Sequence, residues 1–130
     1  MLASSPTHVL RPPPRHCAQP LGARQQAAID AVDKAVDWIV ANFKSDPKAT
    51  HAGAVPFLFL LGIVAGGWQM GRAAVIARSR MAGGDSDPFW AAKLATTRFF
   101  ADHFLTQAAG LAESVVAGAA GVLEIADDSF

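Results

Sequence analysis

The chain has 130 residues, which is the size of one domain. Hydrophobic residues make up 52% and charged residues 17%, so there is enough apolar material for one core and too little charge for a disordered chain. The formal net charge is 0, which argues against nucleic-acid binding because that function needs a basic surface. The single cysteine, Cys17, allows no disulfide within the chain, so we expect a cytoplasmic protein.

The N-terminal segment is rich in proline and has no apolar periodicity. Pro6, Pro12, Pro13 and Pro14 interrupt it, and it lacks the apolar stretch of a secretory signal. We therefore predict a disordered arm over residues 1–21 and one helical domain over residues 22–130.

A first helix is predicted from about Gly22 to Phe43. Its apolar residues recur every three or four positions and form one stripe: Ile29, Val32, Val36, Ile39 and Phe43. Ser45-Asp46-Pro47 ends this helix and starts the next, because Asp or Ser caps a helix start and proline suits its first turn.

A second helix is predicted over roughly Pro47 to Met81. Pro56 lacks the N–H and clashes with the preceding turn, so it should kink or break the helix there. The main segment is then about Val55 to Met81, and Gly83-Gly84 closes it.

A third helix is predicted after Ser86-Asp87-Pro88 and should continue to about Val116. Its apolar stripe repeats at spacings of three and four, through Trp90, Leu94, Thr97, Ala101, Phe104, Ala108, Leu111 and Val115. Gly118 and Gly121 end the helix, and residues 122–125 can form one last short turn.

No segment has the alternating pattern of a strand, so the fold class is all-α. We expect an antiparallel helical bundle of three main helices, plus a short fourth element from the kink at Pro56 or from the C-terminal tail. The core is expected to include Ile29, Val32, Val36, Ile39, Leu58, Leu61, Val64, Trp68, Leu94, Phe104 and Leu111.

The run from Ala52 to Gly71 has no charged residue and is long enough to span a bilayer. A small single-pass membrane protein with a span near residues 52–71 is therefore the alternative hypothesis. A buried central helix is favoured, because Pro56, Gln69 and four glycines dilute the apolarity of the run. The apolar stripes of the first and third helices also need a partner, which this helix supplies.

No catalytic, cofactor-binding or metal-binding residue is predicted. His8, His16, His51 and His103 lack the spacing of metal ligands, and the neighbours Asp102 and His103 point to different helix faces. Gly62 to Gly67 does not match a dinucleotide loop, so a packing role is expected for these glycines. The remaining candidates have structural interpretations. Ser114 and Ser129 have no base nearby, and Trp38, Trp68 and Trp90 are expected in the core. Gln69 and Thr97 can hydrogen-bond across the bundle, and the preferred interpretation is that they are polar groups satisfied within the core.

Two segments of the predicted helices have a distinctive order of residues. The first comprises Gly53-Ala54-Val55-Pro56-Phe57-Leu58, Leu61-Gly62, Ala65-Gly66-Gly67-Trp68 and Arg72-Ala73-Ala74. The second is Asp87 to Phe100, of which Lys93 to Phe100 is the most specific part. In this order and at this spacing they resemble the C-terminal domain of long acyl-CoA dehydrogenases. The resemblance covers roughly residues 23–130, and the first helix matches more weakly than the other two.

The resemblance implies a flavoenzyme whose full-length members bind FAD and dehydrogenate an acyl-CoA thioester. In that family a glutamate base and most FAD contacts lie in a dehydrogenase core that precedes this domain. The chain has no room for that core, so no catalytic residue is transferred to it. We expect an accessory domain for structure or oligomerisation, inactive by itself, whose partner is the dehydrogenase core or a sister subunit in a homo-oligomer.

Overall fold

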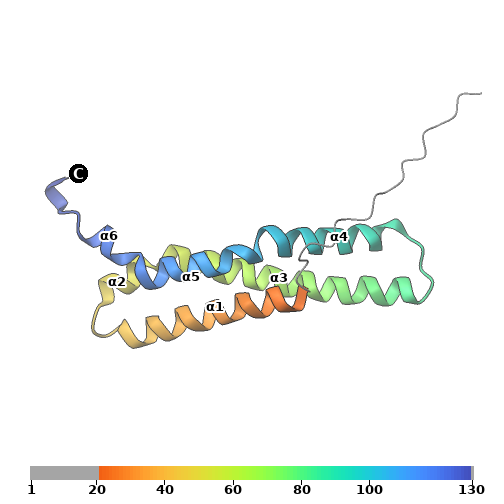
Figure 1. Ribbon diagram of the computed structural model, residues 1–130, viewed down its shortest axis with the longest axis horizontal. Helices are drawn as coiled ribbons and strands as arrows, with labels where there is room; N and C mark the ends of the chain where they lie inside the picture. The colour runs from red at the N-terminus through yellow and green to blue at the C-terminus, as the bar shows by residue number, and fades with distance from the viewer. Residues whose placement is uncertain (1–20, 130) are drawn as a thin grey trace, which may run out of the picture.

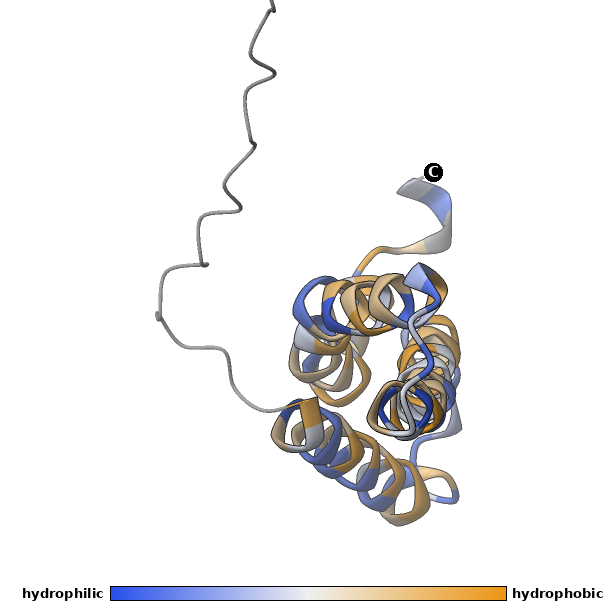
Figure 2. Ribbon diagram, turned by 90° about the vertical axis from the view of Figure 1, so that its right-hand side faces the viewer, coloured by the Kyte–Doolittle hydropathy of each residue, from blue (hydrophilic) through white to orange (hydrophobic). Residues whose placement is uncertain are grey.

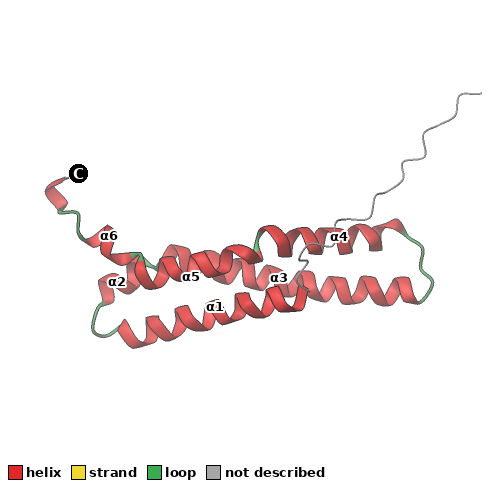
Figure 3. Ribbon diagram, in the orientation of Figure 1, coloured by secondary structure: helices red, strands yellow, loops and turns green. Residues whose placement is uncertain are grey.

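The computed structural model describes residues 21–129, and they form an all-α bundle (Figures 1 and 3). Its α-helices are α1 (Leu21–Asn42), α2 (Pro47–Ala52), α3 (Ala54–Ala82), α4 (Pro88–His103), α5 (Ala108–Ala117) and α6 (Ala119–Leu123). Two 3-10 turns, η1 (Leu105–Gln107) and η2 (Asp127–Ser129), complete the order. The predicted fold class is confirmed, and no strand occurs between residues 21 and 129. The predicted arm lies outside the described residues, except Leu21, which begins α1.

The long helix α3 runs the length of the bundle, and the other helices pack along it. α4 and α5 follow one another antiparallel to α3, and α1 lies beside α5 and the N-terminal half of α3 (Figure 1). With 22 residues against 29, α1 is about 10 Å shorter than α3 at 1.5 Å per residue. One end of the bundle therefore has three helices side by side, whereas the other end is the α3–α4 hairpin alone.

Two Asp-Pro pairs start helices as the sequence predicts. Asp46 Oδ1 accepts a hydrogen bond from the Ala49 N–H at 3.1 Å, and Asp87 Oδ1 accepts one from the Phe89 N–H at 2.9 Å. Each cap satisfies a backbone donor that has no partner within the helix. The turn between α3 and α4 needs a positive φ at Gly84, which is 89°.

The break in the second predicted helix falls at Gly53 and not at Pro56. Pro56 is the third residue of α3, within the first turn, where backbone N–H groups lack helical partners and proline removes no hydrogen bond. At the start of α3 the Phe57 N–H, one residue after Pro56, donates a backbone hydrogen bond to the Gly53 carbonyl at 3.0 Å. A β-carbon on Gly53 would lie 3.3 Å from Val115, so the break also lets α5 approach closely.

The third predicted helix is not continuous, because η1 separates α4 from α5. Backbone carbonyl groups at the end of α4 accept hydrogen bonds from polar side chains of η1. Thr106 Oγ1 donates to the Asp102 carbonyl at 3.1 Å, and Gln107 Nε2 donates to the His103 carbonyl at 2.7 Å. The tighter turn rotates Leu105 into the core and leaves Phe104 on the surface. Leu105 and Ala112 are thus buried where the predicted heptad had Phe104 and Leu111, whereas Ala101, Ala108 and Val115 are buried as predicted.

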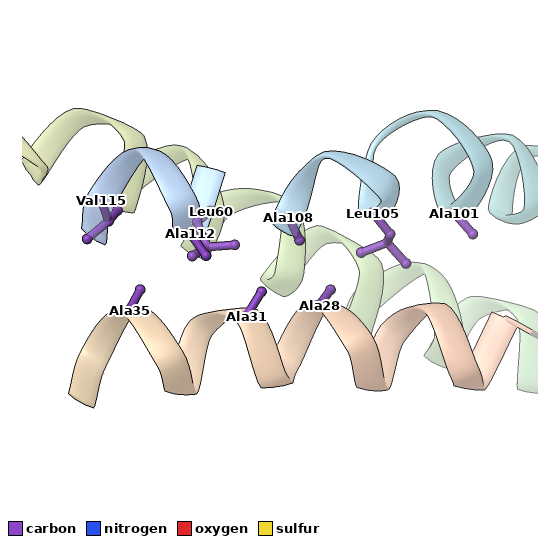
Figure 4. Close-up of a cluster of buried hydrophobic side chains, with 9 residues drawn as sticks. All are labelled: Ala28, Ala31, Ala35, Leu60, Ala101, Leu105, Ala108, Ala112 and Val115. Atoms are coloured by element: carbon purple, nitrogen blue, oxygen red, sulfur yellow. The ribbon is translucent and has the colours of Figure 1, made fainter. Parts of the chain in front are cut away.

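The core consists mainly of small side chains. Alanines of α1 face α5 and the end of α4 in one cluster, made of Ala28, Ala31, Ala35, Leu60, Ala101, Leu105, Ala108, Ala112 and Val115 (Figure 4). Small side chains let helix axes approach closely, and larger residues such as Val32, Ile39 and Leu111 pack at the edges of the cluster.

The predicted core list is wrong for six of its eleven residues. Those that the structure places on the surface are Ile29, Val36, Leu58, Leu61, Trp68 and Phe104. The other five are partly buried: Val32, Ile39, Val64, Leu94 and Leu111. In α1, α3 and α5 the buried positions are mainly alanine or glycine, and they lie beside the positions of the large apolar residues. Figure 2 shows the bundle nearly end-on, and apolar residues occur around the long helices and not only on the sides that face the centre.

Candidate functional site

The outer face of α3 has a continuous apolar stripe that no other described element covers. Leu58 is 68% exposed, Leu61 40%, Trp68 56% and Val75 69%. These residues alternate at spacings of three and four with two further exposed residues, Ala65 and Arg72. We call these six residues the α3 stripe; its spacing is that of a helix that packs against a partner helix.

The inner side of α3 explains why the α3 stripe faces outward. Leu60, Gly67, Ala74 and Ala77 are its buried residues. A β-carbon on Gly67 would lie within 2.7 Å of Leu105 Cδ2 and still closer to Gln25, so only glycine fits without movement. Because α1, α4 and α5 approach from this side, the opposite side has no neighbour among the described elements.

The packing role predicted for the glycines between residues 62 and 67 is confirmed at two of three positions. A β-carbon on Gly66 would lie 2.8 Å from the Phe100 ring, and Gly67 contacts η1 and α1. A β-carbon on Gly62 would meet no atom of the described residues within 4 Å, and the same holds for Gly71 further along α3.

α3 is long and apolar enough to cross a membrane, and it is the one such helix among the described residues. Only 11% of its most apolar stretch is buried, so α3 is central in the bundle but is not the buried helix that the sequence predicts. The α1 and α5 helices pack along the same stretch and have exposed charges, among them Asp33, Lys34 and Glu113. A bilayer around α3 would have to accommodate these charges, at a cost of several kcal/mol.

Two ion pairs join α1 to the helices beside it. Arg24 pairs with Asp102 of α4 at 3.1 Å, and Lys34 Nζ lies 2.7 Å from Glu113 Oε2 of α5. The second pair is exposed on both sides, so it contributes little to stability. These contacts orient α1 and do not resemble a catalytic arrangement.

Buried polar groups fix how the helices sit on α3. The buried Thr97 hydroxyl lies 2.9 Å from the Lys93 carbonyl and 3.3 Å from the Met70 carbonyl of α3, which confirms that it is satisfied within the core. Gln25 Nε2 donates to the Val64 carbonyl at 3.1 Å. Gln69, by contrast, is exposed and its side chain bonds Arg72 of the same helix, so its expected place in the core is wrong.

A shallow groove of about 460 Å³ lies along α4. Its lining comes from a single helix, through Leu94, Ala95, Arg98, Phe99, Asp102 and His103. Asp102 already pairs with Arg24, and the imidazole of His103 lies 4.3 Å from the Phe99 ring. Within residues 21–129 no second element supplies a reacting group opposite them, so these residues do not place a base and a nucleophile in hydrogen-bond reach there.

The titratable residues outside this groove are dispersed. Residues 21–129 contain no group of three or more His, Cys, Asp or Glu side chains that could hold a metal ion. His51 packs edge-on to the Phe43 ring at 6.2 Å, and Ser114 donates to the Gly110 carbonyl of its own helix. His8 and His16 lie outside the described residues. Of the tryptophans, Trp38 and Trp90 are half-buried, whereas Trp68 lies on the surface, against expectation.

The described residues do not fit a flavin. A flavin pyrophosphate is commonly held by a glycine-rich turn between a strand and a helix. Here Gly62, Gly66 and Gly67 lie within α3, and the last two are packed against side chains. No reaction step through a flavin is therefore derived for these residues.

One carboxylate has a perturbed pKa, in the turn before α4. The backbone N–H of Asp87 donates to Asp85 Oδ1 at 3.1 Å and lowers the pKa of Asp85 below its ordinary 3.8, because the bond favours the ionised form. The positive charge of Arg80 adds to this shift. Asp85 is fully exposed and closes the α3–α4 turn, so its role is structural.

Comparison with known proteins identifies the family. Residues 7–126 match the family described as acetyl-CoA dehydrogenase C-terminal like. The chain belongs to this family, so the resemblance carried by residues 53–74 and 87–100 is confirmed. The match begins at residue 7, earlier than the expected residue 23.

Over 90 residues the chain is 38% identical to the 3-methylmercaptopropionyl-CoA dehydrogenase of Ruegeria pomeroyi. The alignment covers 69% of this chain but 15% of that enzyme, so the chain spans a small part of its relative's length. No solved structure matches the chain.

Apolar spacing in the sequence identifies residues of the α3 stripe but not the side that they face. Leu58, Leu61 and Trp68 were expected in the core, and the structure exposes all three. The signal that distinguishes the two sides is the buried glycine and alanine stripe of α3, at positions 67, 74 and 77.

Proposed function

We propose that the chain is an accessory domain of an FAD-dependent acyl-CoA dehydrogenase, which contributes packing surface for assembly and no catalytic group. The observation that supports this most directly is the α3 stripe. Soluble monomers rarely leave a large contiguous apolar patch exposed to solvent, and such patches usually mark interaction sites. In this proposal the stripe docks on the dehydrogenase core or on a sister domain, in the cytoplasm.

The chemistry belongs to the rest of the enzyme in this proposal. Abstracting a proton next to a thioester needs a positioned base with a suitable pKa, and accepting hydride needs a held flavin. Every carboxylate whose side chain is described is exposed, at helix surfaces, turns or the C-terminal end. The oxidation of fatty acyl-CoA or of another acyl-CoA is therefore proposed for the complete enzyme alone.

The proposal is tested with chimeras of the Ruegeria enzyme, in which residues 22–130 of this chain replace the matching segment. We expect the chimera to bind FAD and to turn over its substrate within about twofold of the parent. Deletion of the segment should instead lower the melting temperature or change the assembly state. A chimera that assembles normally but loses turnover would place a catalytic role in this domain and overturn the proposal.

The membrane-span alternative is separated from this proposal by fractionation without detergent. We expect the chain in the soluble fraction with the circular dichroism of a helical protein. Membrane association that resists carbonate would favour a span at residues 52–71 instead.

A further inference from the structure

We propose that the α3 stripe is a self-pairing surface, on which α3 of a second copy of this chain packs antiparallel. This inference deepens the proposed function and rests on it, because it names the sister domain as the partner of the stripe. Three features of α3 support self-pairing: the order of residues along the stripe, their exposure to solvent and the position of the arginines.

The α3 stripe is complementary to itself when reversed. In an antiparallel pair centred between Ala65 and Trp68, Leu58 lies opposite Val75 of the second copy. Leu61 lies opposite Arg72 of the second copy, and the small Ala65 lies opposite the large Trp68. A two-fold symmetric interface requires this relation, in which residue i contacts residue j and j contacts i. In this pairing the large Trp68 meets the small Ala65, Leu61 meets the flexible Arg72, and Leu58 and Val75 form an apolar pair at each end.

The charges of α3 favour the antiparallel arrangement. Residues 52–71 have no charge, and Arg72, Arg78 and Arg80 all lie in the second half of the helix. A parallel pair would place Arg72 beside Arg72 of the second copy, and like charges in a helix interface repel. The antiparallel pair separates the two Arg72 side chains and places each beside Leu61, along which its methylene stem can lie.

The exposed area suffices for a specific dimer. The stripe together with Ile76, which is 53% exposed, leaves on the order of 600 Å² open per copy, so a pair would bury roughly 1,200 Å², the lower end of specific interfaces. Trp and Arg are the residue types most enriched among strong interface contacts, and Arg72 lies 5.0 Å from the Trp68 ring at the centre of the stripe.

The first test uses charge substitutions in the full chain, measured by sedimentation equilibrium and light scattering without detergent. Wild-type protein should have twice the chain mass of 13.6 kDa. Leu58→Lys and Val75→Glu should each raise the dimer dissociation constant about a hundredfold, because each is present at both ends and costs about tenfold per end. The double variant should recover to within about tenfold of wild type, since Lys at 58 faces Glu at 75 of the second copy.

Substitutions at Leu58 and Val75 should leave folding intact because both side chains are exposed. Val40→Lys, at a 73% exposed position on α1, should leave the dissociation constant unchanged. Circular dichroism should be the same for all variants. Leu58 and Val75 are about 25 Å apart along one helix, so the recovery cannot arise within a single chain.

A second test reads the register directly in a Cys17→Ser background. A mixture of Leu58→Cys and Val75→Cys chains should form a disulfide heterodimer under mild oxidation, whereas Leu58→Cys alone should not, because its two sulfurs would lie far apart. Cross-linking of Leu58→Cys with itself would show a parallel pair and overturn the proposal.

The outcomes separate this inference from the proposed function. A chain that is monomeric at all concentrations, or single variants that remain dimeric, would overturn self-pairing. If that monomer nevertheless binds the dehydrogenase core through the same residues, the accessory role stands and the dehydrogenase core is the partner of the α3 stripe. If the stripe variants change neither self-association nor binding to the core, both proposals fail.

Discussion

Single glycines decide how closely the helices approach α3. Gly67 is buried, and a β-carbon there would overlap Leu105 of η1 and Gln25 of α1. Gly71 lies one turn further along the same helix and has no atom within 4 Å of such a carbon. Two glycines in one helix therefore have opposite expected responses to the same substitution.

We expect Gly67→Ala to lower the free energy of unfolding by about 1–3 kcal/mol, because the added methyl overfills a packed site. Gly71→Ala is the matched control and should raise it by about 1 kcal/mol, through the helix propensity of alanine alone. Urea denaturation with an unchanged m-value measures both. Equal effects of the two substitutions would contradict the close approach of η1 and α1 at Gly67.

Asp85 should titrate below the ordinary aspartate value. Its pKa is lowered in the folded protein, so its contribution to stability is present above the unfolded pKa of about 3.8 and is lost as the pH falls through the folded value. A carboxyl-carbon NMR titration should show its midpoint below 3.8. Asp85→Asn should remove this part of the acid dependence, whereas an unshifted midpoint would refute the turn geometry at Asp87.

At the scale of elements, the alanine stripe of α1 determines the distance between α1 and α5. Ala28, Ala31 and Ala35 face Ala108, Ala112 and Val115 across this contact (Figure 4). There is little space for a larger side chain, because Ala35 and Val115 are each 0% exposed.

Ala35→Leu is expected to destabilise the protein by about 1–3 kcal/mol, since it forces α1 away from α5. Ala41→Leu, at an exposed position of the same helix, changes the same side chain without that contact and should be nearly neutral. Thermal or chemical unfolding of the pair measures the difference. If Ala35→Leu left the free energy of unfolding unchanged, α1 and α5 would not be as closely packed at Ala35 as the structure shows.

At the scale of the whole molecule, the structure contains packing surfaces and no assembled reaction centre among its described residues. Helices α1, α3 and α5 bury mainly small residues toward one another, and several large apolar residues of α3, among them Leu58, Trp68 and Val75, remain exposed. This distribution fits a domain that completes its burial in a larger assembly.

Purified alone, the chain is expected to bind no FAD and to oxidise no acyl-CoA. Its described carboxylates are all exposed, and its described glycines lie in helices and turns, so these residues supply neither a base nor a pyrophosphate site. Absorbance in the flavin band after incubation with excess FAD and desalting tests binding. A retained chromophore, together with acyl-CoA turnover in the presence of an electron acceptor, would refute the prediction.

The sequence by itself determined the helices, their order and the family. Apolar periodicity placed the first helix within a residue of α1, and the pairs Asp46-Pro47 and Asp87-Pro88 marked two helix starts, because these signals act within a few residues of chain. Only the tertiary structure decided which stripe of each helix faces inward and where η1 interrupts the third helix. That choice depends on how closely neighbouring helices pack, and contacts such as Gly67 with Leu105 join residues far apart in the sequence, so no local pattern of hydrophobicity contains it.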